Sequence, residues 1–117
     1  MNAVTIDRAA LSDLQDTAGA EFVAELAETF FEEAPGMFAE LRAAQSAGAQ
    51  AQFRRAAHSI KTNALTFGAA LLAASARDLE RDGLSTNTTA IEALEAAYEV
   101  TRLALKEILH GLSLIHI

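Results

Sequence analysis

Apolar residues recur at intervals of three and four along the last third of the chain, and this spacing constrains the fold more than any other feature. The run consists of Ile91, Leu94, Tyr98, Thr101, Leu105 and Ile108. Residues at this spacing lie on one side of an α-helix, so the run predicts a long amphipathic helix. Thr89 followed three residues later by Glu92 predicts where it begins, since this pair forms a capping box. Such a helix has to bury its apolar face against other helices.

The rest of the chain is predicted to be helical as well. Of 117 residues, 51% are hydrophobic and only one is a proline, a composition that favours helices over strands. Apolar periodicity, divided by Gly19, Pro35, Gly48 and Gly68, predicts helices from near Asp7 to Gly19 and over residues 20–33, 35–46, 49–66 and 69–81, with a polar loop at 84–88. We therefore expect an all-α fold, an antiparallel four-helix bundle with one or two short additional N-terminal helices.

One of these predictions concerns particular side chains. Phe22, Leu26 and Phe30 are four residues apart, so we expect them to share the buried face of the helix at 20–33.

The chain length fits one domain, which we assign to residues 1–111. Residues 112–117, LSLIHI, show no helix continuation, and we interpret them as sequence derived from a cloning vector. His116 is therefore left out of the functional argument.

Charge and composition exclude several classes of function. The net charge of −7 argues against a nucleic-acid partner, because phosphate backbones are bound by clustered lysine and arginine. The absence of cysteine removes thiolate metal sites and thiol nucleophiles and fits the cytoplasm. The longest apolar run, residues 67–76, is far below the roughly 20 residues that a membrane-spanning helix needs, and no secretory signal is visible. We expect a cytoplasmic monomer that binds neither membrane nor nucleic acid.

The run AHSIKTNALTFGA, residues 57–69, carries the candidate functional residue, His58. At about 100° per residue, one side of the predicted helix collects Phe53, Ala57, Ile60, Ala64 and Phe67. His58 points roughly 140° away from that side, so the imidazole is predicted to face water.

Cations surround this histidine in the sequence. Arg54 and Lys61 stand four residues before it and three after it, the spacings of helical neighbours, and Arg55 and Thr62 lie close on its other side. Residues 52–63 contain no acidic residue, which predicts a small positive patch on an acidic protein. A neutral imidazole is a competent nucleophile near neutral pH, and neighbouring cations can pair with phosphoryl oxygens once it is modified. The pattern is typical of a phosphoryl carrier.

With these residues placed, the chain resembles the histidine phosphotransfer (HPt) domains of bacterial multistep two-component signalling. The resemblance rests on His58, Ile60, Lys61, two small or polar residues, and Phe67-Gly68-Ala69, and extends more weakly from about residue 6 to about residue 110. It implies that His58 accepts a phosphoryl group from a receiver-domain aspartate and passes it to another, with Lys61 as the cation beside the phosphate. Its partners would be response-regulator receivers or a hybrid sensor histidine kinase.

The same resemblance implies a carrier without catalytic machinery or cofactor of its own, because the receiver would supply the magnesium ion. Arg54 is predicted to assist Lys61 at the phosphate. The predicted docking residues are Arg55, Thr62, Leu65 and Gly68. Thr62 stands where the family most often has glycine, Leu65 lies within about 20° of the His58 direction, and Gly68 would form the turn after the helix.

Two alternatives belong to other classes. A helical interaction module would bind a receiver or another helix through the surface around His58 without carrying phosphate. A carboxylate-bridged di-metal bundle would need two Glu-x-x-His pairs facing inward, whereas the chain has one such pair, Glu107 and His110. We therefore predict no metal site. A Ser-His hydrolase is excluded, because Ser59 follows His58 directly and projects about 100° away from it.

Overall fold

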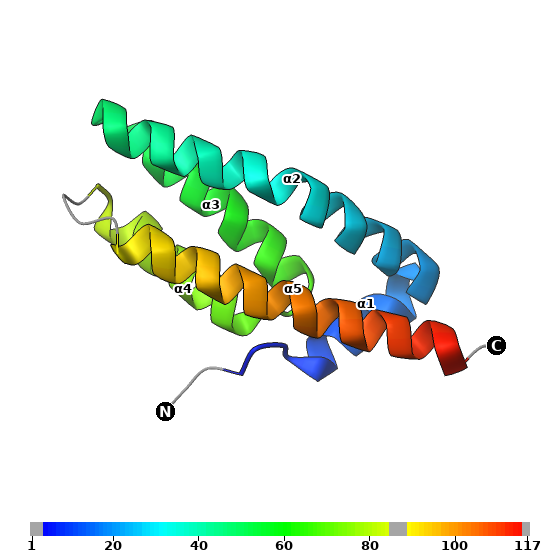
Figure 1. Cartoon of the computed structure of the whole chain (residues 1–117). Helices are drawn as coiled ribbons and strands as arrows, with labels where there is room; N and C mark the ends of the chain where they lie inside the picture. Colours follow the sequence, from blue (N-terminus) through cyan, green and yellow to red (C-terminus); the bar gives the residue numbers. More distant parts are fainter. Residues whose placement is uncertain (1–3, 85–88, 116–117) are drawn as a thin grey trace.

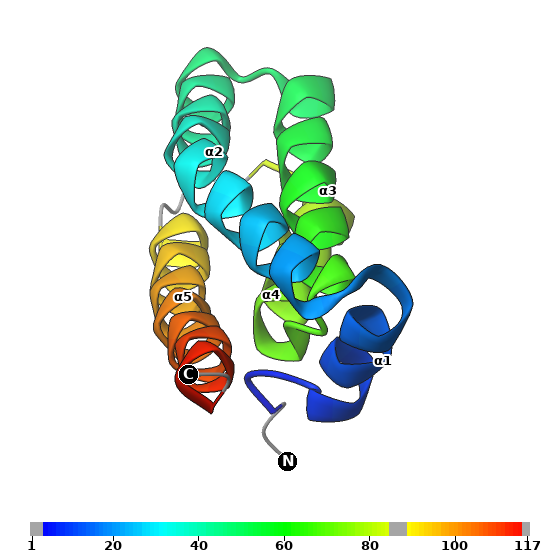
Figure 2. The same cartoon turned by 90° about the vertical axis from the view of Figure 1, so that its right-hand side faces the viewer.

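A computed structural model describes residues 4–84 and 89–115, and five α-helices make up most of them (Figure 1). The helices are α1 (Arg8–Ala18), α2 (Ala20–Ala47), α3 (Gln50–Thr66), α4 (Ala70–Asp82) and α5 (Thr89–Ile115). Helices α2 to α5 form an antiparallel bundle, and the short α1 lies at the end of the bundle where α3 turns into α4 (Figure 2). The predicted all-α bundle is confirmed, with one additional N-terminal helix.

Pro35 does not divide α2, so the two predicted helices over residues 20–33 and 35–46 are one. Proline lacks the N–H that would bond to the carbonyl of Phe31. Pro35 is exposed, however, so water can reach the backbone around it. The buried residues continue at three- and four-residue spacing through this point: Val23, Ala27, Phe30, Ala34, Phe38, Leu41 and Ala44. Packing of this continuous face outweighs the local cost of the proline.

The buried face of α2 begins at Val23, not at Phe22. The Phe22 side chain is 51% exposed, Leu26 is partly buried and Phe30 is buried. The prediction that all three share the buried face is therefore wrong for Phe22. The prediction assumed a spacing of four residues throughout. Because a helix has 3.6 residues per turn, the intervals between buried positions alternate between three and four residues.

An aromatic cluster links the helices at the centre of the bundle. Phe67, at the end of α3, stacks on Phe30 of α2 with ring centroids 5.9 Å apart. Tyr98 of α5 meets Phe30 and Phe38 edge to face at 5.7 and 5.4 Å. The predicted α5 face is confirmed, since five of its six residues are buried and Ile108 is partly buried. These contacts fix the rotation of α3 and so decide which of its residues face water.

The C-terminal end of the chain corrects one prediction. Helix α5 continues through Gly111 to Ile115, where no helix was expected. A glycine inside a helix costs only about 1 kcal/mol relative to alanine, and leucine, which occurs twice among residues 112–115, favours helix. The interpretation of residues 112–117 as vector-derived stays a prediction. His116 and most of the predicted loop, residues 85–88, lie outside the described residues.

The segment before α1 closes the turn between α3 and α4. The Asp7 carboxylate accepts hydrogen bonds from the N–H groups of Ala9 and Ala10, which confirms Asp7 as the N-cap. The Asp7 backbone N–H donates to the Gly68 carbonyl at 2.7 Å. Gly68 has a φ of +67°, and a Cβ built on it would lie 2.8 Å from the Asp7 carbonyl oxygen. Only glycine fits this turn.

We expect Gly68→Ala to lower the free energy of unfolding by about 2–4 kcal/mol. Alanine is strained at this positive φ, and its Cβ would also overlap the Asp7 carbonyl oxygen. Chemical denaturation monitored by circular dichroism measures the change. Gly36→Ala is the matched control: Gly36 lies inside α2 with nothing within 4 Å of a built Cβ, so alanine should be neutral or stabilising there. Equal stabilities of the two variants would contradict the packing described for Gly68.

Candidate functional site

His58 lies on the solvent-facing side of α3, as predicted. The opposite side of the helix is buried through Phe53, Ala56, Ala57, Ile60 and Ala64. The His58 side chain is 57% exposed. Because the core contacts of α3 fix its rotation, the imidazole is presented to water from a rigid element.

A carboxylate from the neighbouring helix holds the ring. Glu80 of α4 places Oε2 2.9 Å from Nδ1 of His58 and Oε1 2.6 Å from Nζ of Lys61. One carboxylate thus joins the imidazole and the ammonium group, an arrangement called the Glu80 bridge below. Residues 52–63 contain no acid, as the sequence showed, but Glu80 of another helix adds a carboxylate, so the predicted positive patch is not purely cationic around His58.

The Glu80 bridge keeps its carboxylate ionised. Hydrogen bonding from Lys61, and to a smaller extent from His58, lowers the pKa of the Glu80 carboxyl against the opposing effect of partial burial. A carboxylate with a lowered pKa remains an anion at neutral pH, and an anion accepts hydrogen bonds without donating any. The proton between His58 and Glu80 therefore belongs to Nδ1 of the ring.

This proton assignment decides which ring nitrogen is reactive. In a neutral imidazole one nitrogen carries the proton and the other keeps its lone pair. With Nδ1–H directed at Glu80, the lone pair is on Nε2. The arrangement provides a nucleophilic nitrogen on an exposed side chain whose tautomer and orientation are set by a second group.

Lys61, Arg54 and Arg55 lie on the same helix as His58, but their surroundings differ. Lys61 is drawn toward α4 by Glu80, and its side chain is 23% exposed. Arg54 and Arg55 are exposed, and neither forms an ion pair with any described residue. All three cations lie on α3, as predicted, and of the three only Lys61 forms an ion pair with a described carboxylate.

Of the predicted docking residues, Thr62 and Leu65 are exposed. The Thr62 hydroxyl donates to the His58 carbonyl at 3.0 Å, so it is occupied within the helix. The Leu65 side chain is 60% exposed although it is apolar. Gly68 differs from both: it is buried against Asp7 and Ala10, which leaves a partner no access to it. Its predicted docking role is wrong, because it shapes the turn from beneath.

Glu80 is the site residue that sequence reasoning missed. It stands 22 positions from His58, so no helical projection of the 49–66 segment includes it. A signal was nevertheless present. The two predicted helices are joined by a tight turn at Gly68 and must run antiparallel, and His58 and Glu80 lie at similar distances along the chain on either side of that turn.

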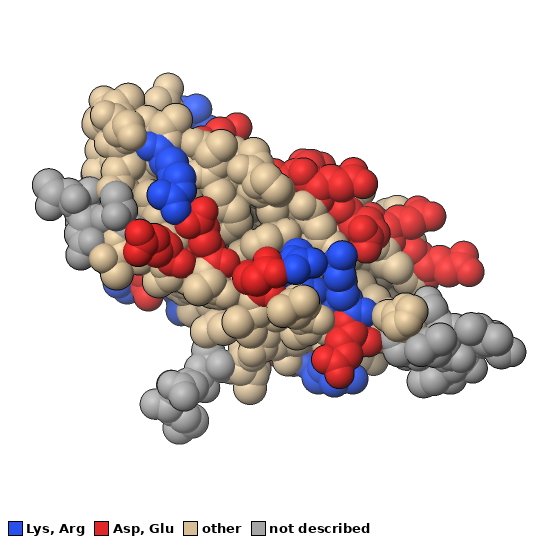
Figure 3. Space-filling view, in the orientation of Figure 1, with Lys and Arg blue, Asp and Glu red and all other residues tan. Residues whose placement is uncertain are grey.

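The face formed by α2 and α5 has a different character. Acidic side chains gather over the N-terminal half of α2 (Figure 3), where Glu21, Glu25, Glu28 and Glu32 are exposed. Within residues 4–84 and 89–115, no helix combines the length and the apolarity needed to cross a bilayer.

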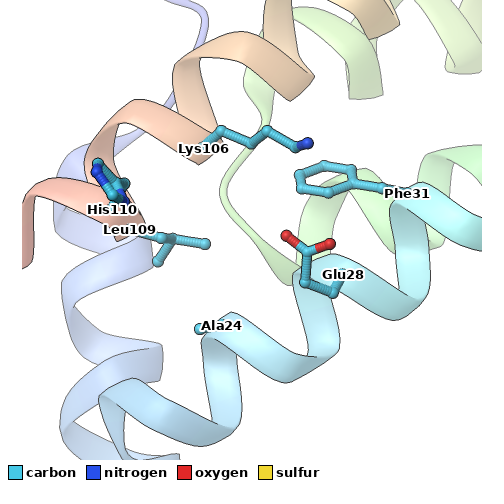
Figure 4. A pocket seen from close by; sticks show the side chains of 6 residues that line it. All are labelled: Ala24, Glu28, Phe31, Lys106, Leu109 and His110. Carbon is cyan, nitrogen blue, oxygen red and sulfur yellow. The ribbon is translucent and has the colours of Figure 1, made fainter. Parts of the chain in front are cut away.

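A hollow of about 320 Å³ opens between α2 and α5 (Figure 4). It is lined by Ala24, Glu28, Phe31, Lys106, Leu109 and His110. The Lys106 ammonium lies 5.6 Å from the centre of the Phe31 ring.

The di-metal alternative does not fit this structure. Glu107 and His110 are both exposed, whereas a bundle metal site needs ligands that face inward. Among the described residues no three histidine, aspartate or glutamate side chains are grouped so that they could hold a metal ion.

Comparison with known proteins places the chain in a family. The model of the Hpt domain matches residues 25–112, well over half of the chain, and this range contains His58, Lys61 and Glu80. No curated protein and no solved structure matched. The chain belongs to the Hpt domain family, whose members are phosphocarrier modules of two-component phosphorelays.

Proposed function

We propose that this protein accepts a phosphoryl group from a receiver-domain aspartate on Nε2 of His58 and passes it to the aspartate of a second receiver. The observation that carries the proposal is the contact of 2.9 Å between Glu80 and Nδ1, which leaves Nε2 of an exposed imidazole as the nucleophile. Membership of the Hpt domain family supports the same reading.

The transfer needs no redox change and no further reactant. The Nε2 lone pair attacks the phosphorus of the aspartyl phosphate, the N–P bond forms, and the P–O bond breaks with its electron pair going to the aspartate. Nδ1 keeps its proton, and the positive charge that develops on the ring is stabilised by the adjacent Glu80 carboxylate. The reverse sequence delivers the phosphoryl group to the second receiver.

The division of labour between the partners follows from what the site contains. Glu80 orients the ring and Lys61 stands beside it, while the exposed Arg54 would donate to the phosphoryl oxygens. The receiver would supply the magnesium ion that neutralises the transferring group, and a monomer in the cytoplasm suits such exchange. Arg55, Thr62 and Leu65 would meet the receiver around His58.

Transfer from a panel of phosphorylated receiver domains tests the proposal. We expect acid-labile, alkali-stable phosphate on the protein after incubation with at least one receiver, and return of that phosphate to a second receiver. A receiver that binds without transferring its phosphoryl group would instead support the helical interaction module.

We expect Leu65→Glu to weaken receiver binding about tenfold, because it puts a charge where an apolar side chain is predicted to dock. Isothermal titration calorimetry with a receiver that transfers phosphate measures this change. Leu103→Glu on α5 is the matched control, since Leu103 is 56% exposed and Leu65 is 60% exposed. Neither variant should unfold the bundle. Equal losses of affinity in both variants would remove Leu65 from the docking surface.

A further inference from the structure

Arg77 of α4 is an exposed arginine without an ion pair or side-chain hydrogen bond to any described residue. The next arginine of the same helix, Arg81, is by contrast engaged by Asp78 and Asp82. A guanidinium group that no carboxylate neutralises keeps its donors and its charge available to an anion. Its position relative to His58 therefore decides what it can do.

Two contacts define the register of α3 against α4. Gln50 accepts a hydrogen bond from the Leu84 backbone at 2.7 Å, and His58 contacts Glu80 at 2.9 Å. The two helices are antiparallel, so residue numbers rise along α3 as they fall along α4. One turn beyond the contact between His58 and Glu80, Lys61 on α3 is therefore level with Arg77 on α4. Arg77 also precedes Glu80 by three residues, a spacing that puts Cβ atoms about 5–6 Å apart on a helix. It thus flanks the Glu80 bridge from the α4 side.

The charges around His58 indicate what a cation at the position of Arg77 can stabilise. Glu80 and Lys61 neutralise each other in the resting site. A phosphoryl group on His58 would add a charge of about −1.5 to −2 at neutral pH, beside the negative charge of Glu80. A cation that is not already paired with a carboxylate would stabilise this charge. Of the two arginines of α4, Arg81 is paired with Asp78 and Asp82, whereas Arg77 forms no ion pair with any described residue.

We infer that Arg77 binds the phosphoryl group carried by His58 and so forms a second cationic wall of the site, contributed by α4. This inference rests on the proposed function, because it requires phosphate on Nε2. Its guanidinium would donate to phosphoryl oxygens from α4 while Arg54 approaches them from α3, with the Glu80 bridge between the two helices. A guanidinium fork suits this contact, since its paired N–H groups match two oxygens of one phosphate.

The experiment separates this inference from the phosphorelay itself. The full chain is phosphorylated with phosphoramidate, which transfers its phosphoryl group to an imidazole nitrogen and releases ammonia, so no receiver is needed. His58→Gln identifies the ³¹P resonance of His58 among those of the other histidines. A pH titration of that resonance then gives the second ionisation of the phosphoryl group, which a nearby cation lowers.

We expect Arg77→Gln to raise this phosphoryl pKa by about 0.3–0.7 unit, the range for one solvent-exposed charge pair. Arg77→Lys keeps the charge and should restore most of the shift, whereas Arg81→Gln should leave the titration unchanged because Arg81 is already paired. An unchanged titration in Arg77→Gln, or equal shifts in Arg77→Gln and Arg81→Gln, would overturn the inference.

A second measurement follows the equilibrium with a phosphorylated receiver. Arg77→Gln should lower the ratio of His58 phosphate to receiver phosphate about two- to fivefold. A chain that shows the ³¹P shift but takes no phosphate from any receiver supports the contact and contradicts the proposed function. An unchanged ratio together with unchanged titration refutes the contact while leaving the phosphorelay intact.

Discussion

His58→Gln is expected to abolish phosphorylation by every receiver that phosphorylates the wild-type protein. Glutamine has no nucleophilic nitrogen, and the described site offers no other imidazole that could replace the ring. Because the His58 side chain is 57% exposed, the free energy of unfolding should change by no more than about 0.5 kcal/mol. Radiolabelled phosphoreceivers give the transfer rate, and thermal denaturation gives the stability.

His110→Gln provides the matched control for this variant. His110 is also an exposed helical histidine, but it lies on α5 beside the hollow shown in Figure 4, where Lys106 and Leu109 are its neighbours. Transfer to His110→Gln should equal that to wild type. Phosphate that persists on His58→Gln and disappears from His110→Gln would refute the assignment of the carrier residue.

Glu80→Gln is expected to slow phosphorylation of His58 by about ten- to hundredfold, the range seen when the group that orients a metal-binding imidazole is removed. The substitution preserves shape but replaces an acceptor-only carboxylate with an amide that can also donate. Such an amide can stabilise the tautomer that carries its proton on Nε2, and that nitrogen then has no lone pair for the phosphorus. Rapid-quench transfer kinetics from one receiver measure the loss.

Asp78→Asn, on the same helix but paired with Arg81, should transfer at the wild-type rate. A rate for Glu80→Gln equal to that of Asp78→Asn would show that the Glu80 bridge has no part in transfer.

Wild type and Glu80→Gln are also expected to differ in how their stability depends on pH. Since contacts in the fold lower the pKa of Glu80, its ionised form favours the folded state. That contribution is complete above the pKa of glutamate in the unfolded chain and disappears as the pH falls through the lowered value. Wild type should therefore exceed Glu80→Gln in free energy of unfolding at pH 7, and the difference should shrink in acid.

The features that the sequence predicted are those that depend on one helix at a time. The buried side of α3 and the outward direction of His58 follow from residue spacing within a single helix, and both are confirmed. The Asp7 cap and the ends at Gly19 and Gly48 follow from local backbone chemistry.

The features that could not be predicted arise between helices. Pro35 was expected to end a helix, but a buried face shared with three other helices holds α2 together across it. The partner of His58 comes from α4, so it appears only once the register of α3 against α4 is known. Gly68 was predicted to dock a receiver. Its burial could not be predicted, because Asp7, which lies against it, belongs to a distant part of the chain.

The hydrogen bond between Asp7 and Gly68 has a consequence for where this domain ends. The Hpt match starts at residue 25, yet Ile6 and Leu11, which precede it, are buried. A polypeptide trimmed to residues 25–112 would retain His58, Lys61, Arg77 and Glu80, but it would leave the Gly68 carbonyl without its donor and the nearby apolar side chains in water. Within the described chain, the folded unit therefore extends beyond the residues that the family model matches, since Ile6, Asp7 and Leu11 pack into it.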